Sequence, residues 1–487
     1  MLLSQALGLN ASQPMLDFVD IDLDLDFPLY IDPAGFRRPR DEFAQRCQDD
    51  LRSFFNAVLR ALKRGRRAQG LELLQGLREP NEIHFGVSKG EPNGRGLGSG
   101  QAQDVLNSLL SSKAAKTGLL KDLNDAALFI EGIGADKVSD MTTNIIRRHL
   151  IAYTQEQFSL LGQAIPTKIP TGLLWDSTTG TWVTDELDFI PVIQGKRVLL
   201  VPKRYVRWKG ALHQAASKYY NNFVTNYIRD DQLRTNGTLV EVIKTKKKPP
   251  QRKVFKKRIK EKHPLTKPFL AEFSSDHPEE YRKFRASLDR HAAVGVRSLM
   301  EVRGGTFDET GFCLGLIDAL SRVPTGRRHA NDYHHLMLGI ITYLFYPDLI
   351  SPALELEINE GRKRIDISYQ NSAEFGFFKD RKDDAFTRSR EVVIECKNYA
   401  DDIANPEIDQ MAGRFDPRRG RFGLVTCRGI DDGAALRKRL MDVFQAQNGI
   451  ILCLSDADVI GLLKVAPLNR DVAVQNLLRA KLREIST

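Results

Sequence analysis

The last third of the chain alternates between the hydrophobic period of a helix and that of a strand. Helical spacing of apolar residues is found at 332–345, 406–415 and 434–444, and short apolar or alternating runs that predict strands are found at 353–358, 363–368, 391–397, 422–427 and 449–454. The resulting order begins αβββαβ. It predicts an α/β domain over residues 324–487, with a mixed central sheet flanked by helices.

The first half of the chain combines a strand-like beginning with helices, which predicts an α+β module over residues 1–240. Acids alternate with apolar residues at its start: Asp20, Asp22, Asp24 and Asp26 against Val19, Ile21, Leu23 and Leu25. This pattern predicts a half-buried strand with its acids on an exposed edge, and a divalent-cation site is the alternative. A helical stretch follows over about 40–77, and a Gln-Gly turn predicts a hairpin between 189–193 and 198–201.

Two further segments of this module have a structural and a functional interpretation. Gly94, Gly96, Gly98 and Gly100 precede a predicted helix, where a flexible loop or a phosphate cradle are the alternatives. Ser139 is predicted to cap a helix that continues past Phe158, with a polar side that is either solvated or a second site.

The positive charge of the chain lies in one place. The net charge is +10, from 72 Lys and Arg against 62 Asp and Glu; residues 244–262 hold eleven of the bases and one of the acids, which leaves 61 against 61. We expect residues 241–265 to be a basic interdomain linker, with contact to a nucleic-acid backbone as the alternative. Residues 266–323 are then a helical connector.

Bulk composition limits the class of protein. A chain of 487 residues exceeds one core, so several domains are expected. The five cysteines are scattered without metal-binding spacing, which favours reduced core residues. No apolar run reaches membrane-spanning length and no secretory signal is evident, so the protein is expected to be cytoplasmic, without a membrane partner.

Acids and a lysine lie at corresponding places on two neighbouring predicted strands. By the two-residue strand period, Asp366 shares a face with Arg364, whereas Glu395 shares a face with Lys397. An Asp and a Glu-x-Lys that end apolar strands can converge on one cation, and carboxylates are ligands that Mg²⁺ prefers.

The strand order together with these residues resembles the PD-(D/E)xK, or restriction-endonuclease-like, nuclease superfamily, over residues 324–456. The resemblance implies that Asp366 and Glu395 are metal ligands and that Lys397 is catalytic. Gln410, on the helix after Glu-x-Lys, matches the branch that includes methyl-directed restriction enzymes and archaeal Holliday-junction resolvases. Asp332 is the nearest match to an additional metal-ligand acid of the first helix. The chain departs from the family in having Ile365 before Asp366.

Such a site is expected to use Mg²⁺, with Mn²⁺ as a substitute, and to leave a 5′-phosphate and a 3′-hydroxyl. Lys397 would orient or deprotonate the attacking water or stabilise the developing charge, and these roles stay open. Basic residues around the predicted sheet edge are candidate nucleic-acid contacts, with solvated loop charge as the alternative: Arg364, Lys379, Arg381, Lys382, Arg414, Arg418, Arg419 and Arg421.

The sequence therefore predicts a magnesium-dependent endonuclease acting on DNA, most simply double-stranded. By resemblance it would form a homodimer to cut both strands. The N-terminal module is expected to sense a trigger, bind a regulatory partner or hold the nuclease inactive, as in a bacterial anti-phage defence system. The alternatives are a structure-specific repair nuclease or resolvase, and a catalytically inactive DNA-binding or assembly protein with a nuclease-like fold. RNA also remains open as a substrate.

Overall fold

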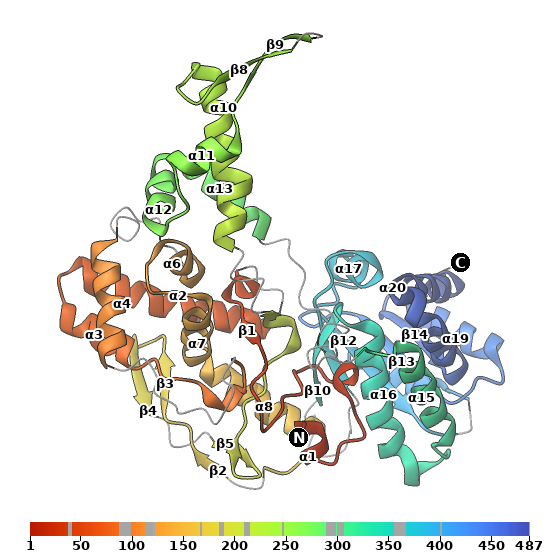
Figure 1. Ribbon diagram of the computed structural model, residues 1–487. Coiled ribbons are helices and arrows are strands. Elements are labelled where there is room, and N and C mark those ends of the chain that lie inside the picture. The colour runs from red at the N-terminus through yellow and green to blue at the C-terminus, as the bar shows by residue number, and fades with distance from the viewer. Residues whose placement is uncertain are drawn as a thin grey trace.

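The chain folds into an N-terminal body, a projecting arm and a C-terminal body (Figure 1). The computed structural model describes residues 1–37, 41–86, 99–112, 120, 122–165, 168–184, 189–208, 215–245, 248–288, 299, 306–354, 367–399 and 402–486. The fold is mixed α/β: several small sheets lie in the first two parts, and one mixed five-stranded sheet lies in the third.

The N-terminal body is a set of helices beside small antiparallel sheets. Its helices are α1 (Leu3–Ala6), α2 (Glu42–Lys63), α3 (Arg67–Gln75), α4 (Ser99–Ser111), α6 (Leu123–Phe129), α7 (Ala135–Ile145) and α8 (Arg147–Leu160), with the short η1 (Gln13–Met15) and η2 (Pro33–Phe36). Its strands pair as β1 (Leu29–Ile31) with β7 (Val206–Trp208), β2 (Lys168–Pro170) with β5 (Phe189–Ile193), β5 with β6 (Lys196–Arg197), and β3 (Leu173–Asp176) with β4 (Thr181–Thr184). The predicted hairpin turn is confirmed, because Gln194 and Gly195 both have positive φ, but its second strand is β6 (Lys196–Arg197) and not the predicted 198–201.

The acidic segment at the start differs from the predicted strand. Val19, Ile21 and Leu23 are buried as expected, but Asp20 and Asp22 are buried as well. Asp20 accepts hydrogen bonds from the backbone N–H and the hydroxyl of Ser4, at 2.9 and 2.7 Å. The prediction of an exposed acidic edge is therefore wrong for these two acids, because the chain before them folds back and covers them.

The prediction of a helix start at Ser139 is also wrong. The N-cap residue of α7 is Gly134, five residues before Ser139. The Ser139 hydroxyl instead accepts a hydrogen bond from the backbone N–H of Ile31, at 3.0 Å. A serine side chain that joins a helix to a distant strand gives the same sequence signal as a cap. The predicted phosphate cradle lies mostly outside the described residues.

The arm contains most of the basic segment. Its elements are η5 (Tyr220–Val224), α10 (Thr225–Thr235), β8 (Glu241–Thr245), β9 (Lys248–Lys253), α11 (Lys256–Lys262), α12 (Lys267–Asp276) and α13 (Pro278–Leu288). Strands β8 and β9 pair only with each other, and Figure 1 shows this ribbon pointing away from both bodies. The segment expected to be a linker thus has secondary structure of its own.

The C-terminal body is built on one mixed sheet, as predicted. In order along the sheet its strands are β10 (Leu349–Leu354), β11 (Ile367–Asn371), β12 (Glu391–Lys397), β13 (Phe422–Cys427) and β14 (Ile450–Ser455). Strand β11 is antiparallel to both of its neighbours, β10 and β12, whereas β12, β13 and β14 are parallel. The helices are α15 (Glu309–Arg322), α16 (Ala330–Phe345), α17 (Gly376–Asp383), α18 (Asn405–Ala412), α19 (Gly433–Gln445) and α20 (Asp456–Ser486).

Helices cover both faces of this sheet. On one face the Tyr369 hydroxyl of β11 donates to the Leu338 carbonyl of α16, at 3.2 Å. On the other, Gly423 of β13 leaves so little room that an added Cβ would lie 2.7 Å from the sulfur of Met411 in α18. Helix α15 packs against α16 and α20, so it belongs to this body although residues 266–323 were expected to be a connector.

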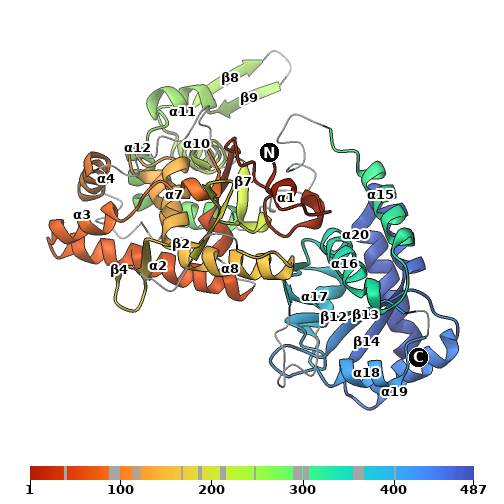
Figure 2. The ribbon, with the colours of Figure 1, turned by 90° about the horizontal axis from the view of Figure 1, so that it is seen from below.

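The two bodies are packed directly against each other (Figure 2). Met15 of η1 joins the apolar core of the C-terminal body, and the side-chain amide of Gln157 in α8 donates to the Pro352 carbonyl of β10, at 3.1 Å. The Arg204 guanidinium donates to the Pro347 carbonyl, also at 3.1 Å. The ammonium of buried Lys203 lies 4.2 Å from the centre of the Tyr346 ring.

Candidate active site

The predicted Glu-x-Lys lies at the end of β12, in the middle of the sheet. Strand β12 is rich in β-branched residues and is buried on both faces through Ile394, with β11 on one side and β13 on the other. Glu395 continues this buried run and its side chain has no solvent exposure. Lys397, the last residue of the strand, is 16% exposed. The strand therefore carries a carboxylate inside the body and an ammonium at its rim.

Two cations balance the charge of Glu395. The Lys397 ammonium lies 3.2 Å from one carboxylate oxygen, and the Arg414 guanidinium lies 2.6 Å from the other. Arg414 is only 5% exposed. Within the described part of the chain, neither carboxylate oxygen has a partner with good hydrogen-bond geometry. Burial of an ion is costly without opposite charge, so this arrangement stabilises an ionised Glu395 chiefly through charge.

Helix α18 positions the residues on one side of Glu395. Its first turn is closed by Glu407, which accepts a hydrogen bond from the Ala404 backbone N–H at 3.0 Å. The chain turns directly after the helix, where the Arg414 N–H donates to the Met411 carbonyl. That turn directs the Arg414 side chain to Glu395. Gln410 is half-buried on the same helix.

Tyr399, two residues beyond Lys397, lies in an acidic environment. Burial raises the pKa of its phenol, and the carboxylates of Glu407 and Glu395 raise it further. Tyr399 therefore stays protonated at neutral pH and can act only as a neutral group.

A second polar group, which the sequence reasoning missed, lies at the carboxyl ends of the parallel strands. Asp456, directly after β14, lies 3.2 Å from the Arg428 guanidinium and accepts a hydrogen bond from the Tyr333 hydroxyl at 3.0 Å. Burial raises the pKa of Asp456, and Arg428 opposes that effect. The sequence signal that could have found this group is the position of Arg428 and Asp456 directly after two predicted strands. Residues that follow neighbouring parallel strands meet at one edge of a sheet.

The structure places the remaining predicted acids differently. Asp332 is 67% exposed and pairs with His329 at 3.2 Å, and none of its contacts in the described chain reaches Glu395. Asp366 and Arg364 lie outside the described residues. Ile367, which follows Asp366 in the sequence, pairs with Ile394, which precedes Glu395.

The predicted nucleic-acid contacts divide into inward and outward residues. Arg414 points inward to Glu395, and the Lys382 ammonium donates to the Asn371 carbonyl at 2.7 Å. Arg381, which lies 5.7 Å from the Phe377 ring centre, and Arg421 are half-buried. Nearer the surface, Lys379 pairs with Asp383 at 2.5 Å and Arg419 lies 3.5 Å from Glu391. Arg418 is exposed. Arg418, Arg419 and Lys379 are thus the best placed to meet a ligand.

Comparison with known proteins yields one match. Residues 8–213 match a family model described as a domain of unknown function, DUF8370, which covers most of the N-terminal body and ends just before the arm. No curated protein and no solved structure matches the chain. Among the helices that the structure describes, none is long and apolar enough to cross a bilayer.

Proposed function

We propose that the protein is a magnesium-dependent DNA endonuclease whose C-terminal body has a restriction-endonuclease-like fold. The observation that carries the proposal is the placement of Glu395 and Lys397: a fully buried carboxylate and a rim lysine at the end of a central strand. The mixed sheet with helices on both faces and the position of Gln410 on the next helix support it.

Glu395 is the described candidate ligand for a hard divalent cation, and the described residues contain no group of three or more potential ligands. Glu395 offers two oxygens that lack a well-aligned hydrogen bond within the described residues, and its present balance is purely ionic. Glu395 would hold the metal together with Asp366, as the family resemblance implies. A bound Mg²⁺ supplies neutralisation of the charge that develops on the phosphate and on the leaving oxygen.

The protein's own side chains then have separate tasks. Lys397, at the rim, orients the attacking water or stabilises negative charge on the phosphate. Gln410, half-buried on α18, offers an amide that donates and accepts hydrogen bonds. Arg414 balances the negative charge of Glu395 until another cation replaces it, and its guanidinium is then available to an anionic substrate.

The N-terminal body is proposed to control this site. Its helix α8 and segment η1 pack on β10 and α16 of the nuclease body. A nuclease harms its own cell if unregulated, and direct contact with a separate body is the means of restraint that we propose. This organisation suits an anti-phage defence effector that responds to a trigger or a protein partner.

The proposal is tested by incubating the purified full chain with plasmid, linear DNA and RNA, with and without Mg²⁺. We expect cutting of DNA only with the metal, and a loss of about 100- to 1000-fold in Lys397→Ala. Lys464→Ala, at an exposed position of α20, is the matched control and should cut normally. Metal-dependent cutting that Lys397→Ala leaves intact would sink the site assignment. Preference for branched over plain duplex substrates would favour a repair nuclease.

One observation favours a non-catalytic alternative. A buried Glu395–Arg414 pair at 2.6 Å is also what a degenerate nuclease fold would keep as a structural ion pair. A DNA-binding or assembly protein of this kind would cut no substrate under any metal condition. It would keep its activity in cells after Asp366→Ala, Glu395→Ala or Lys397→Ala.

A further inference from the structure

The ribbon of β8 and β9 is an isolated two-stranded element on the arm. Glu241 pairs with Lys253 and Ile243 with Gln251, and the described residues add no third strand. Both of its faces are largely exposed, including Val242 at 57%. A two-stranded ribbon is marginally stable alone in water, so an exposed one of this length favours a surface that another molecule covers.

The exposed charge of the ribbon and of α11 is almost entirely positive. Exposed bases at described positions are Lys244, Arg252, Lys253, Lys256, Lys257, Arg258, Lys260 and Lys262. The acids Glu241 and Glu261 both lie near Arg258, at 3.4 and 3.8 Å.

Three other bases of this group contact neutral oxygens. The Arg252 guanidinium donates to the Leu233 carbonyl, Lys256 to the Asn221 carbonyl and Lys262 to the Thr238 hydroxyl. Lys244, Lys253, Lys257 and Lys260 form no ion pair with any described residue. Their charge is therefore available to a polyanion.

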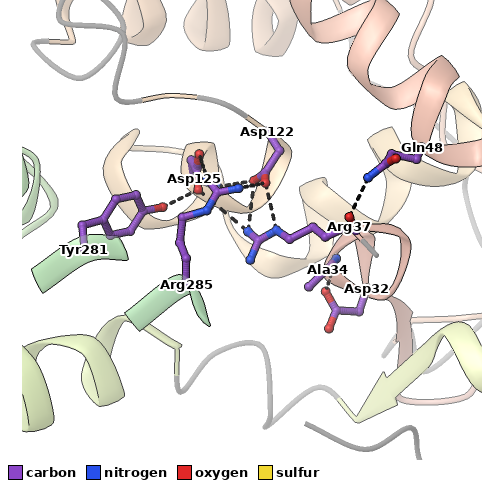
Figure 3. A network of polar contacts seen from close by, with 8 residues as sticks. All are labelled: Asp32, Ala34, Arg37, Gln48, Asp122, Asp125, Tyr281 and Arg285. Carbon is purple, nitrogen blue, oxygen red and sulfur yellow. Dashed lines mark hydrogen bonds and ion pairs between the residues drawn. The ribbon is translucent and has the colours of Figure 1, made fainter. Parts of the chain in front are cut away.

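A buried network anchors the arm to the N-terminal body (Figure 3). Arg285 of α13 lies 2.7 Å from Asp122 and 2.5 Å from Asp125 of the α6 region, and the Tyr281 hydroxyl donates to Asp125. Arg37, from the end of η2, lies 2.9 Å from Asp122. Removing one member of a buried ion pair typically lowers stability by about 3–5 kcal/mol. The network therefore holds the base of the arm firmly to the N-terminal body.

Aromatic packing continues the same attachment. The Tyr281 ring of α13 lies 5.0 Å from Phe129 of α6, and Tyr219 at the start of the arm lies 4.7 Å from Phe284. The base of the arm therefore shares an apolar core with the helices of the N-terminal body. The basic ribbon is carried on a fixed support, unlike the charge of a flexible linker.

We propose that this arm binds double-stranded nucleic acid, with the ribbon lying in a groove and the lysines of α11 on the phosphates. The major groove of B-DNA is wide enough for a two-stranded ribbon, and phosphate contacts by Lys and Arg supply most sequence-independent affinity. An anionic membrane surface is the competing partner. It is disfavoured because the exposed surface of the ribbon and α11 is dominated by charge rather than by an apolar face.

The arm would hold the substrate of the proposed nuclease, yet its binding does not depend on that activity. The test uses the full chain and a fluorescein-labelled duplex in EDTA, where cutting by the proposed centre is blocked. Anisotropy is measured over a salt series. The arm variant carries Lys244→Gln, Lys253→Gln, Lys257→Gln and Lys260→Gln, all at exposed positions.

The matched control carries Lys63→Gln, Arg64→Gln, Arg66→Gln and Arg67→Gln, four exposed bases at the junction of α2 and α3, which includes the last residue of α2 and the first of α3. Both variants remove the same charge. For the arm variant we expect weaker binding and a fall of about 3–4 in the slope of log K against log salt, because each lost phosphate contact contributes about 0.9. The control should bind as the unaltered chain does.

Equal binding by the arm variant and the unaltered chain would overturn the inference, as would equal loss in both variants. The inference would also be overturned if the arm variant lost binding to phosphatidylserine vesicles but still bound the duplex as the unaltered chain does. The proposed nuclease is judged separately, because Glu395→Gln should bind the duplex normally and fail to cut it. If Glu395→Gln loses cutting while the arm variant still binds the duplex normally, only the proposal that the arm binds nucleic acid is refuted.

Discussion

At the scale of residues, the energetics of Glu395 depend on which cation lies beside it. A buried ionised carboxylate is costly unless opposite charge or hydrogen bonds compensate it, and at Glu395 the charge of Lys397 and Arg414 does so. Because the pair with Arg414 is almost completely buried, a metal ion in the proposed centre would have to release a guanidinium as well as desolvate. In that proposal the same contact keeps the site inactive before a metal binds.

Asp140 in α7 gives the N-terminal body a defined dependence on pH. Burial raises the pKa of this carboxyl to about 7 from its usual 3.8, and Glu79 and Asp136 add to the effect. The folded state thus keeps a proton that the unfolded state releases, so stability is lost as pH rises from about 3.8 to about 7.

Asp140→Asn should remove this loss. As pH rises from 5 to 8, we expect the free energy of unfolding of the variant to increase by about 2 kcal/mol relative to that of the unaltered chain. The Tm of both proteins at each pH measures this. Asp104→Asn, at an exposed position of α4, is the control for the same chemical change. A Tm difference that does not vary with pH would contradict the prediction.

The strand period alone was enough to place Glu395 and Lys397 together at the end of a buried strand. It could not show that Arg414 turns inward, because that depends on the turn after α18 and not on any periodicity. Asp20 was misjudged for a similar reason. Its partner, Ser4, comes from a segment whose fold-back carries no local signal.

At the scale of elements, close approach of two segments explains one glycine in α16. An added Cβ at Gly339 would lie 2.4 Å from the terminal methyl of Met15 and 3.1 Å from its Cβ. Gly315 in α15 has nothing within 4 Å of the same position. Glycine inside a helix ordinarily costs about 0.5–1 kcal/mol relative to alanine.

The two alanine substitutions should therefore differ in sign. Gly315→Ala is expected to raise stability by about 0.5–1 kcal/mol. Gly339→Ala is expected to lower it by about 1–3 kcal/mol, because the contact between η1 and α16 is overpacked. Thermal unfolding of both variants measures this. A Gly339→Ala protein as stable as the Gly315→Ala protein would show that Met15 does not pack as closely as described.

Some elements with a clear period were predicted well, but β10 (Leu349–Leu354) and β11 (Ile367–Asn371) overlap the predicted strands 353–358 and 363–368 by only two residues each in the described part of the chain. Strands β12 and β13 have the predicted bounds, Glu391–Lys397 and Phe422–Cys427. The ribbon was missed because its residues are mostly basic and β9 contains Pro249 and Pro250, which usually argue against a strand. Proline is tolerated on edge strands, and both strands of an isolated ribbon are edges.

At the scale of the whole molecule, the contact between the two bodies is the proposed restraint. Gln157 and Arg204 each donate from the N-terminal body to a backbone carbonyl of the C-terminal body. Removing both side chains beyond Cβ would weaken the interface by about 1–2 kcal/mol while leaving the C-terminal body unchanged.

If the N-terminal body restrains the nuclease, Gln157→Ala with Arg204→Ala should raise basal plasmid cutting about 5- to 30-fold. Ser159→Ala, an exposed position on α8, is the control and should cut at the basal rate. A double variant that is less stable yet cuts no faster would argue against restraint through this contact.

The central claim is that Glu395 serves a nuclease centre, and one comparison on a single strand tests it most directly. Glu391 and Glu395 share a face of β12, and Glu391 pairs with Arg419 at 3.5 Å. Plasmid cutting with Mg²⁺ is compared for Glu395→Gln and Glu391→Gln at equal folded concentration. We predict a loss of at least about 100-fold for Glu395→Gln and near-normal cutting for Glu391→Gln. Equal cutting by the two variants would contradict the assignment.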